Sequence, residues 1–97
     1  MLYTINKSPF LSYNLERCLR CAPEGAPILL YEDGVYAALA GSRVDETVRQ
    51  ALAAHPIYAL EPDLQARGLT RLIEGVKVVG YEEFVDLAAE HNVVPWL

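Results

Sequence analysis

Short runs of apolar residues alternate along the chain with longer segments in which apolar residues recur every three or four positions. A short continuous apolar run bounded by turn-forming residues is typical of a strand that is covered on both faces. We therefore predict strands at Leu2–Ile5, Pro27–Tyr31, Ile57–Leu60 and Val76–Val79.

The longer segments predict helices, because a spacing of three and four places apolar side chains on one helical face. Ser12 is the expected N-cap of the first helix, and Pro23 and Gly25 follow its end. Its apolar face comprises Leu15, Cys18, Leu19 and Ala22. Further helical pieces are expected at Val35–Leu39, Val44–Leu52, Pro62–Gly68 and Tyr81–Glu90.

Strands that alternate with helices predict parallel strands joined by right-handed crossovers. We expect an α/β fold, a small sandwich with about four or five mostly parallel strands flanked by helices, formed by residues 1–97 as one domain. Functional groups of such sheets lie beyond the carboxyl ends of the strands. The loops after Ile5, Tyr31 and Leu60 are predicted to lie at that edge.

Apolar residues make up 53% of the 97 residues, slightly more than is usual for a small domain. A chain of this size buries only about 60–70% of its unfolded surface. The surplus indicates that some apolar surface is buried against another subunit. The tail Val93–Leu97 is apolar and too short to bury itself alone.

The net charge of −5 argues against nucleic acid as a direct partner, because phosphate binding needs a basic face. No apolar run approaches the length of a membrane span, and Met1–Phe10 lacks the features of a signal peptide. We therefore expect a cytoplasmic protein without a membrane partner. Its two cysteines, Cys18 and Cys21, are then expected to be reduced.

The two cysteines allow three interpretations. A redox dithiol has the right spacing, but such pairs begin at a helix N-terminus, whereas both thiols here fall later in a helix. A zinc site would need His55 and His91, which are far apart in sequence and lack the usual tight spacing. In the third, Cys18 is a nucleophile whose thiolate is stabilised by Arg17 and Arg20, and Cys21 packs. Spacing alone favours a simpler alternative, in which Cys18 is a small apolar residue of the helix stripe.

Other candidate groups have structural explanations. Glu32 and Asp33 follow a strand, where acid–base groups often occur, but without a nearby histidine a solvated turn is the better interpretation. Asp63 and Arg67 are spaced as a helix-surface ion pair. No phosphate-binding glycine loop is present, and no metal or organic cofactor is expected.

Several segments together resemble the DsrH/TusB family of sulfur-relay proteins. They run in order through essentially the whole chain and end at Trp96-Leu97: Leu2–Phe10, Leu29–Ala38, Tyr58–Leu60, Asp63–Gly68 and Tyr81–Leu87. The resemblance implies a DsrE/F-like fold and a heterohexamer with DsrE/TusD-like and DsrF/TusC-like subunits. Such complexes receive persulfide sulfur and pass it to a DsrC/TusE-like carrier, either for sulfur oxidation or for 2-thiolation of a tRNA wobble uridine.

The resemblance also implies a role for Cys18, because the DsrH branch of sulfur oxidisers carries a cysteine at the matching position. It implies Cys18 as a persulfide acceptor and favours the sulfur-oxidation branch. Arg17 and Arg20, which are next to Cys18 or close to it in sequence, are expected to stabilise its anion. The alternatives are a non-catalytic structural subunit of the tRNA-thiolation relay, or a stand-alone homodimer. Burial of Cys18 would favour the structural role, since sulfur exchange requires access to a thiolate.

Overall fold

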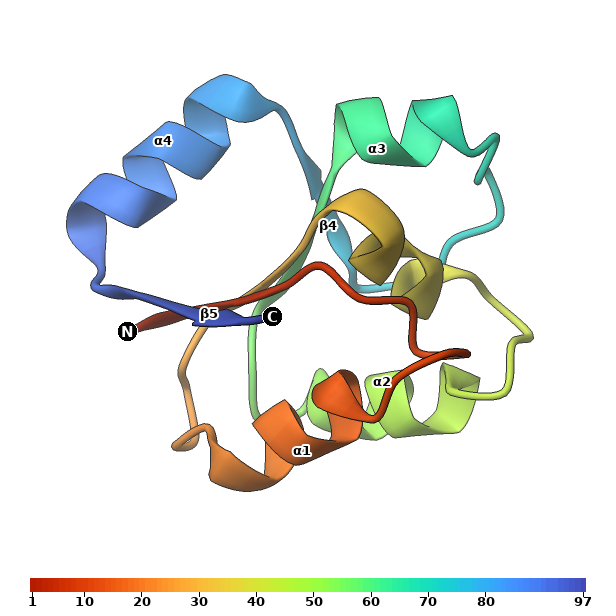
Figure 1. Ribbon diagram of the computed structural model, residues 1–97, viewed down its shortest axis with the longest axis horizontal. Helices are drawn as coiled ribbons and strands as arrows, with labels where there is room; N and C mark the ends of the chain where they lie inside the picture. Colours follow the sequence, from red (N-terminus) through yellow and green to blue (C-terminus); the bar gives the residue numbers. More distant parts are fainter.

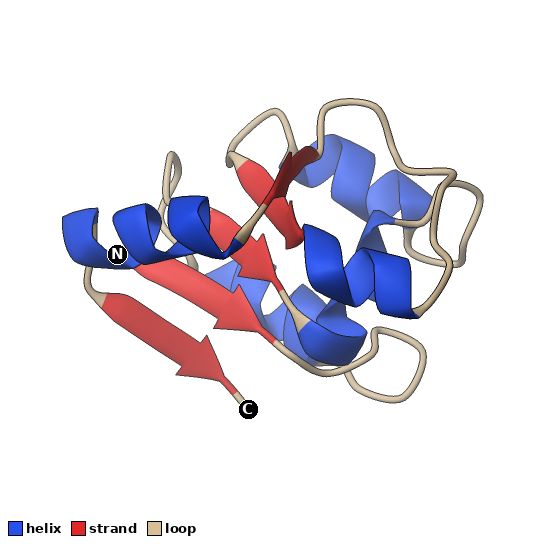
Figure 2. Cartoon of the chain, turned by 90° about the horizontal axis from the view of Figure 1, so that it is seen from above, coloured by secondary structure: helices blue, strands red, loops and turns tan.

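The computed structural model describes residues 1–97 and contains a five-stranded sheet in the order β4-β3-β2-β1-β5 (Figures 1 and 2). Every neighbouring pair of strands is parallel, as the alternating pattern predicts. The strands are β1 (Leu2–Ile5), β2 (Ile28–Leu30), β3 (Ile57–Leu60), β4 (Lys77–Val79) and β5 (Val93–Trp96).

The helices divide unequally between the two faces of the sheet. From β1 to β4 the chain steps in one direction, and then it returns across the sheet to β5. Because parallel crossovers are right-handed, this reversal places the last helix on the opposite face, where Figure 1 shows α4. The first face carries α1 (Asn14–Cys21), the 3₁₀ helix η1 (Glu32–Ala38), α2 (Asp45–Ala51) and α3 (Glu61–Ala66), and the second carries α4 (Tyr81–Glu90).

Alternation along the strands produces two apolar clusters of different size. The larger cluster has 16 buried residues, including Ile5, Ile28 and Ile57 from the sheet. The smaller has four, and its members lie beneath Phe84 and Leu87 of α4: Leu2, Leu29, Leu60 and Val79. No residue of α4 is itself buried, so this helix covers the second face without being enclosed. None of the helices is long and apolar enough to cross a bilayer.

The C-terminal tail forms the edge strand β5, which pairs with β1 from Leu2↔Val93 to Ile5↔Trp96. The Leu2 N–H donates to the Asn92 carbonyl at 2.7 Å, so every second residue from Asn92 bonds toward β1. The nitrogen of Pro95 therefore lies on the outer edge of the sheet, where it has no N–H to offer.

The start of the first helix differs from the prediction. Tyr13, not Ser12, is the N-cap, and it makes no side-chain cap bond. The Ser12 hydroxyl accepts the Asn14 N–H at 3.0 Å instead. A bond to a donor only two residues away closes a local turn, which competes with capping for the same hydroxyl.

Candidate functional site

Polar side chains that follow three neighbouring strands meet at the carboxyl edge of the sheet, as predicted. Asn6 lies after β1, Glu32 after β2 and Asp63 in α3 after β3. The Asn6 amide donates to Glu32 Oε1 at 3.3 Å, and the Glu32 N–H donates to Asp63 Oδ2 at 2.6 Å. The side chain of Asp63 thus ties the start of η1 to α3.

Arg67 forms ion pairs with two of the carboxylates at this edge, those of Asp33 and Asp63. Its guanidinium lies 2.9 Å from Asp33 Oδ1, and a second nitrogen lies 3.7 Å from Asp63 Oδ1, which confirms the ion pair predicted from spacing. Asp33 is largely exposed, as a turn residue would be. These contacts hold η1 and α3 together.

The turn between β2 and η1 presses against the end of β1. Glu32 has a φ of 48°, in the left-handed region, and the next turn brings Gly34 onto the β1 backbone. A Cβ atom on Gly34 would lie 2.1 Å from the carbonyl oxygen of Ile5. Only glycine fits this close approach.

Cys18, the predicted nucleophile, lies in the larger apolar cluster with an exposed fraction of 0%. The pKa of its thiol is raised from 9.0 to about 12. Burial is the larger cause, and the negative charge of a nearby Cys21 thiolate is the smaller one. At neutral pH Cys18 is therefore a protonated thiol that solvent does not reach. This environment is that of a packing residue.

Arg17 and Arg20, which the sequence assigned to Cys18, lie on the exposed face of α1. Together with Cys21 and Trp96 they line a cavity of about 330 Å³. Cys21 is exposed, and its thiol is not part of a disulfide. The structure thus brings the two guanidinium groups to the cavity of Cys21, the cysteine that sequence analysis had set aside as a packing residue.

A sequence signal for this grouping exists but is easily overlooked. Arg17, Arg20 and Cys21 are spaced by three and four, which defines one helical face as clearly as the apolar stripe does. Trp96 joins them from β5, at the other end of the chain, and no local pattern predicts that contact.

The different burial of the two cysteines predicts different reactivity toward iodoacetamide. At pH about 8, close to the pKa of a free thiol, Cys21 is expected to be alkylated promptly and Cys18 to react only after denaturation. Peptide mapping of the alkylated protein checks this difference in labelling, and early labelling of Cys18 would contradict it.

The raised pKa of Cys18 also makes the stability of the fold depend on pH. Because the folded-state pKa of Cys18 is raised, the stabilisation from its burial is complete below pH about 9 and is lost as pH rises toward about 12.

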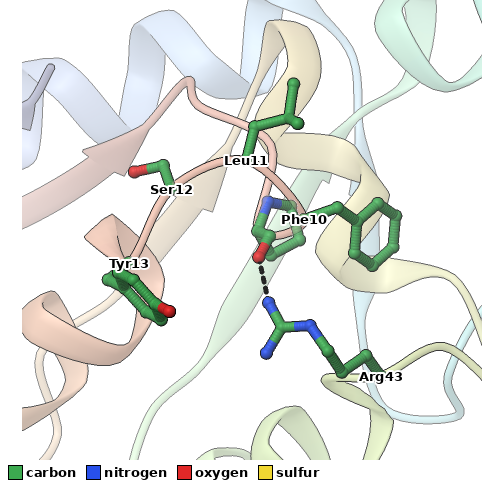
Figure 3. A pocket seen from close by; sticks show the side chains of 6 residues that line it. Phe10, Leu11, Ser12, Tyr13 and Arg43 are labelled. Atoms are coloured by element: carbon green, nitrogen blue, oxygen red, sulfur yellow. Dashed lines mark hydrogen bonds between the residues drawn. The ribbon is translucent and has the colours of Figure 1, made fainter.

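A second cavity, of about 300 Å³, lies beside the loop that connects β1 to α1 (Figure 3). It is lined by Pro9–Tyr13 and Arg43, whose guanidinium donates to the Pro9 carbonyl. Leu11 has an exposed fraction of 90% and points away from Arg43 in Figure 3. With Phe10 and Tyr13 also exposed, this loop presents apolar side chains but no reactive group.

Neither histidine lines the cavity of Cys21. His55 is buried, and its Nδ1 lies 2.9 Å from the Ala26 carbonyl, so it ties the end of the α2 segment to the start of β2. His91 is the C-cap of α4, on the other face of the sheet. No three side chains among the histidines, cysteines and carboxylates gather in a metal-binding arrangement.

Comparison with solved structures shows where this fold occurs. The YchN protein from Escherichia coli superposes with a TM-score of 0.81 at 21% identity, over 97% of each chain. The Methanobacterium thermoautotrophicum protein MTH1491 superposes with a TM-score of 0.74 at 20% identity, over 97% of this chain and 96% of that one. At this identity the likeness concerns the fold alone.

Sequence comparison gives closer relatives. Protein TusB of Pectobacterium carotovorum is 42% identical over 92 residues, 94% of each chain. Protein TusB of an Escherichia coli O1:K1 strain is 41% identical over 93 residues, 95% of each chain. The family model described as DsrH-like protein matches residues 7–94. With nearly the whole chain matched by the family and by its curated members, the protein belongs to the DsrH/TusB family.

Proposed function

We propose that this chain is a structural subunit of a sulfur-relay complex of the DsrEFH/TusBCD kind. In this role it supports DsrE/TusD-like and DsrF/TusC-like subunits, and the transferred sulfur is carried by a partner's cysteine. The observation that carries the proposal is the burial of Cys18, because a thiol with no exposure cannot exchange sulfur with a second protein.

Exposed apolar side chains support a docking role. They occur on the loop after β1, on α4 and at both ends of the chain, and a monomeric chain of this size gains nothing from leaving them in water. The largest exposed fractions are those of Leu11, Leu97, Tyr13, Val85, Met1 and Tyr81, from 90% to 60%.

Two pathways fit such a complex. The TusB relatives at 41–42% identity support a relay that ends in 2-thiolation of a tRNA wobble uridine. The cysteine in the first helix resembles the DsrH branch and supports sulfur oxidation. Co-purification from the native host distinguishes them: a DsrC/TusE-like carrier recovered with sulfite reductase supports sulfur oxidation, and one recovered with a tRNA-thiolating enzyme supports the other pathway. Recovery of a homodimer without other subunits would contradict the proposal.

The structural role predicts that Cys18→Ala leaves sulfur relay unchanged. Alanine fits the apolar site, so the assembled complex should transfer sulfur to its carrier at the wild-type rate, with only a modest loss of stability, about 1 kcal/mol. Sulfur transfer by the purified complex is measured with size-exclusion chromatography as the control for assembly.

The second candidate function is the one that the family resemblance implies, with Cys18 as a persulfide acceptor and Arg17 and Arg20 stabilising its thiolate. It requires α1 to move away from the sheet so that the donor reaches the sulfur. If Cys18→Ala abolishes relay while the complex remains intact, this candidate replaces the structural role.

A further inference from the structure

The outer side of α4 presents an apolar ridge. No residue of this helix is buried, and its contact with the smaller cluster is made by Phe84 and Leu87. Side chains four positions apart form a continuous ridge along a helix. On the exposed side of α4 this ridge consists of Tyr81, Val85 and Ala89. The exposed fractions of Tyr81 and Val85 are 60% and 62%, so the helix offers apolar surface on the side that faces away from the sheet.

An acidic ridge runs beside the apolar one. It consists of Glu82, Asp86 and Glu90, which are one position further along the helix and are all exposed. Residues of both ridges line a hollow of about 360 Å³: Tyr81, Glu82, Val85 and Asp86. The same surface therefore combines apolar contact area with a row of negative charges.

The acidic ridge is unfavourable for the chain on its own. Like charges four positions apart on a helix repel each other, and the helix dipole disfavours a carboxylate in the last turn, where Glu90 lies. No residue of α4 is in any of the four ion pairs of the protein. Lys77 of β4, the strand before α4, lies over the ring of Tyr58 instead, 5.6 Å from its centroid. A partner that brings cations to this row would remove the repulsion.

The partner must suit an apolar ridge and a row of carboxylates at once. Nucleic acids and anionic lipid surfaces carry negative charge, which the row repels. A metal cation would leave the apolar ridge unused. An amphipathic helix with lysine or arginine beside its apolar stripe uses both ridges, because the ridges of one helix pack into the grooves of another. Such a helix needs about three turns to match α4, whose 10 residues span about 15 Å.

We propose that the outer side of α4 docks a basic amphipathic helix of a partner protein. The apolar stripe of the partner packs along the apolar ridge, and its lysine or arginine side chains pair with the acidic ridge. An interface of this length lies at the low end of the size range for protein complexes, where association is weak and reversible.

This inference deepens the proposed docking role and rests on it for the origin of the partner. The two can fail separately. Failure of the chain to assemble with DsrE/TusD-like and DsrF/TusC-like subunits would overturn the structural role, whereas failure of the isolated chain to bind a basic amphipathic peptide overturns this inference alone.

The test titrates the isotope-labelled full-length chain with a synthetic peptide of about 18 residues, in which a leucine stripe lies beside a lysine row. In NMR spectra, the backbone amide shifts of α4 are expected to change and those of α1 and α2 to stay unchanged. A scrambled peptide of the same composition keeps the charge and loses the stripe, so it should bind about fivefold more weakly or less. Equal binding of the two peptides, or shift changes spread over all acidic segments of the chain, would overturn the proposal.

Single substitutions test the two ridges separately. Val85→Ala removes apolar surface and Asp86→Asn removes one charge, and each is expected to raise the Kd of the peptide about twofold to fivefold. Glu24→Gln removes the same charge from an exposed site outside α4 and should leave the Kd unchanged. Circular dichroism verifies that each variant is folded. If either substitution in α4 leaves the Kd unchanged, the proposal is overturned.

The melting temperature of the free chain gives an independent readout. Asp86 is in the middle of the acidic ridge, so Asp86→Asn removes its repulsion with both Glu82 and Glu90. The melting temperature should therefore rise by about 2–5 °C while peptide binding weakens. A fall in the melting temperature would show that the acidic ridge stabilises the chain by itself, and this would overturn the proposal.

Discussion

Replacing Gly34 by alanine is expected to remove most of the stability of the fold. The new Cβ would lie 2.1 Å from the carbonyl oxygen and 2.9 Å from the carbonyl carbon of Ile5, both in the backbone of β1. Because β1 is paired on both sides, by β2 and β5, it cannot move away without breaking the sheet. We expect a loss of about 4 kcal/mol or more, against a total of about 5–15 kcal/mol for a typical domain.

Urea denaturation followed by circular dichroism measures this effect, and Gly80→Ala is the matched control. Gly80 has an ordinary φ of −91°, and an added Cβ would meet only the flexible end of Glu83, at 3.4 Å. Its substitution should cost about 1 kcal/mol or less. Equal midpoints for the two variants would show that η1 and β1 can separate without cost.

Replacing Leu29 by alanine is expected to cost about 3 kcal/mol and to loosen α4 selectively. Leu29 is fully buried, and it belongs to the smaller cluster of four residues. Since one helix alone covers that face, no second element can close the cavity that truncation leaves. Relative to the wild type, Leu29→Ala should therefore speed the exchange of the α4 amide protons with solvent more than that of the α1 and α2 amide protons.

Val85→Ala provides the comparison on the same helix. Val85 has an exposed fraction of 62%, on the outer side of α4, so its truncation should change the free energy of unfolding by less than about 0.5 kcal/mol. If Leu29→Ala were equally mild, the small cluster would not be what holds α4 on the sheet.

Local pattern predicted most of the fold because strands and helices differ in period. Leu2–Ile5, Ile57–Leu60 and Tyr81–Glu90 have the predicted bounds, and the ends of these segments are set by turn-forming or helix-ending neighbours. The tail Val93–Leu97 is described from the sequence only as apolar and too short to bury itself alone, and its strand β5 is a finding of the structure. As an edge strand, β5 tolerates Pro95, and edge position is a property of the whole sheet.

The candidate site was predicted less well, because the two cysteines differ in what surrounds them in space. Helical spacing already places Cys18 in the apolar stripe of α1, and the structure adds that this stripe joins a cluster containing residues of other elements, such as Val48 of α2. The adjacency of Cys18 to Arg17 in sequence suggested a stabilised thiolate. Consecutive residues of a helix point about 100° apart, however, so neighbours along the chain face different surroundings.

The proline at the free edge of β5 bears on how this protein associates with others. An incoming strand would need a continuous row of backbone donors and acceptors, and the missing N–H interrupts that row at its middle. Extension of the sheet into a neighbouring molecule, whether in an ordered oligomer or in a fibril, is thereby disfavoured on this side. A protein that docks at this edge would instead be held there by side chains rather than by a continued ladder of backbone hydrogen bonds.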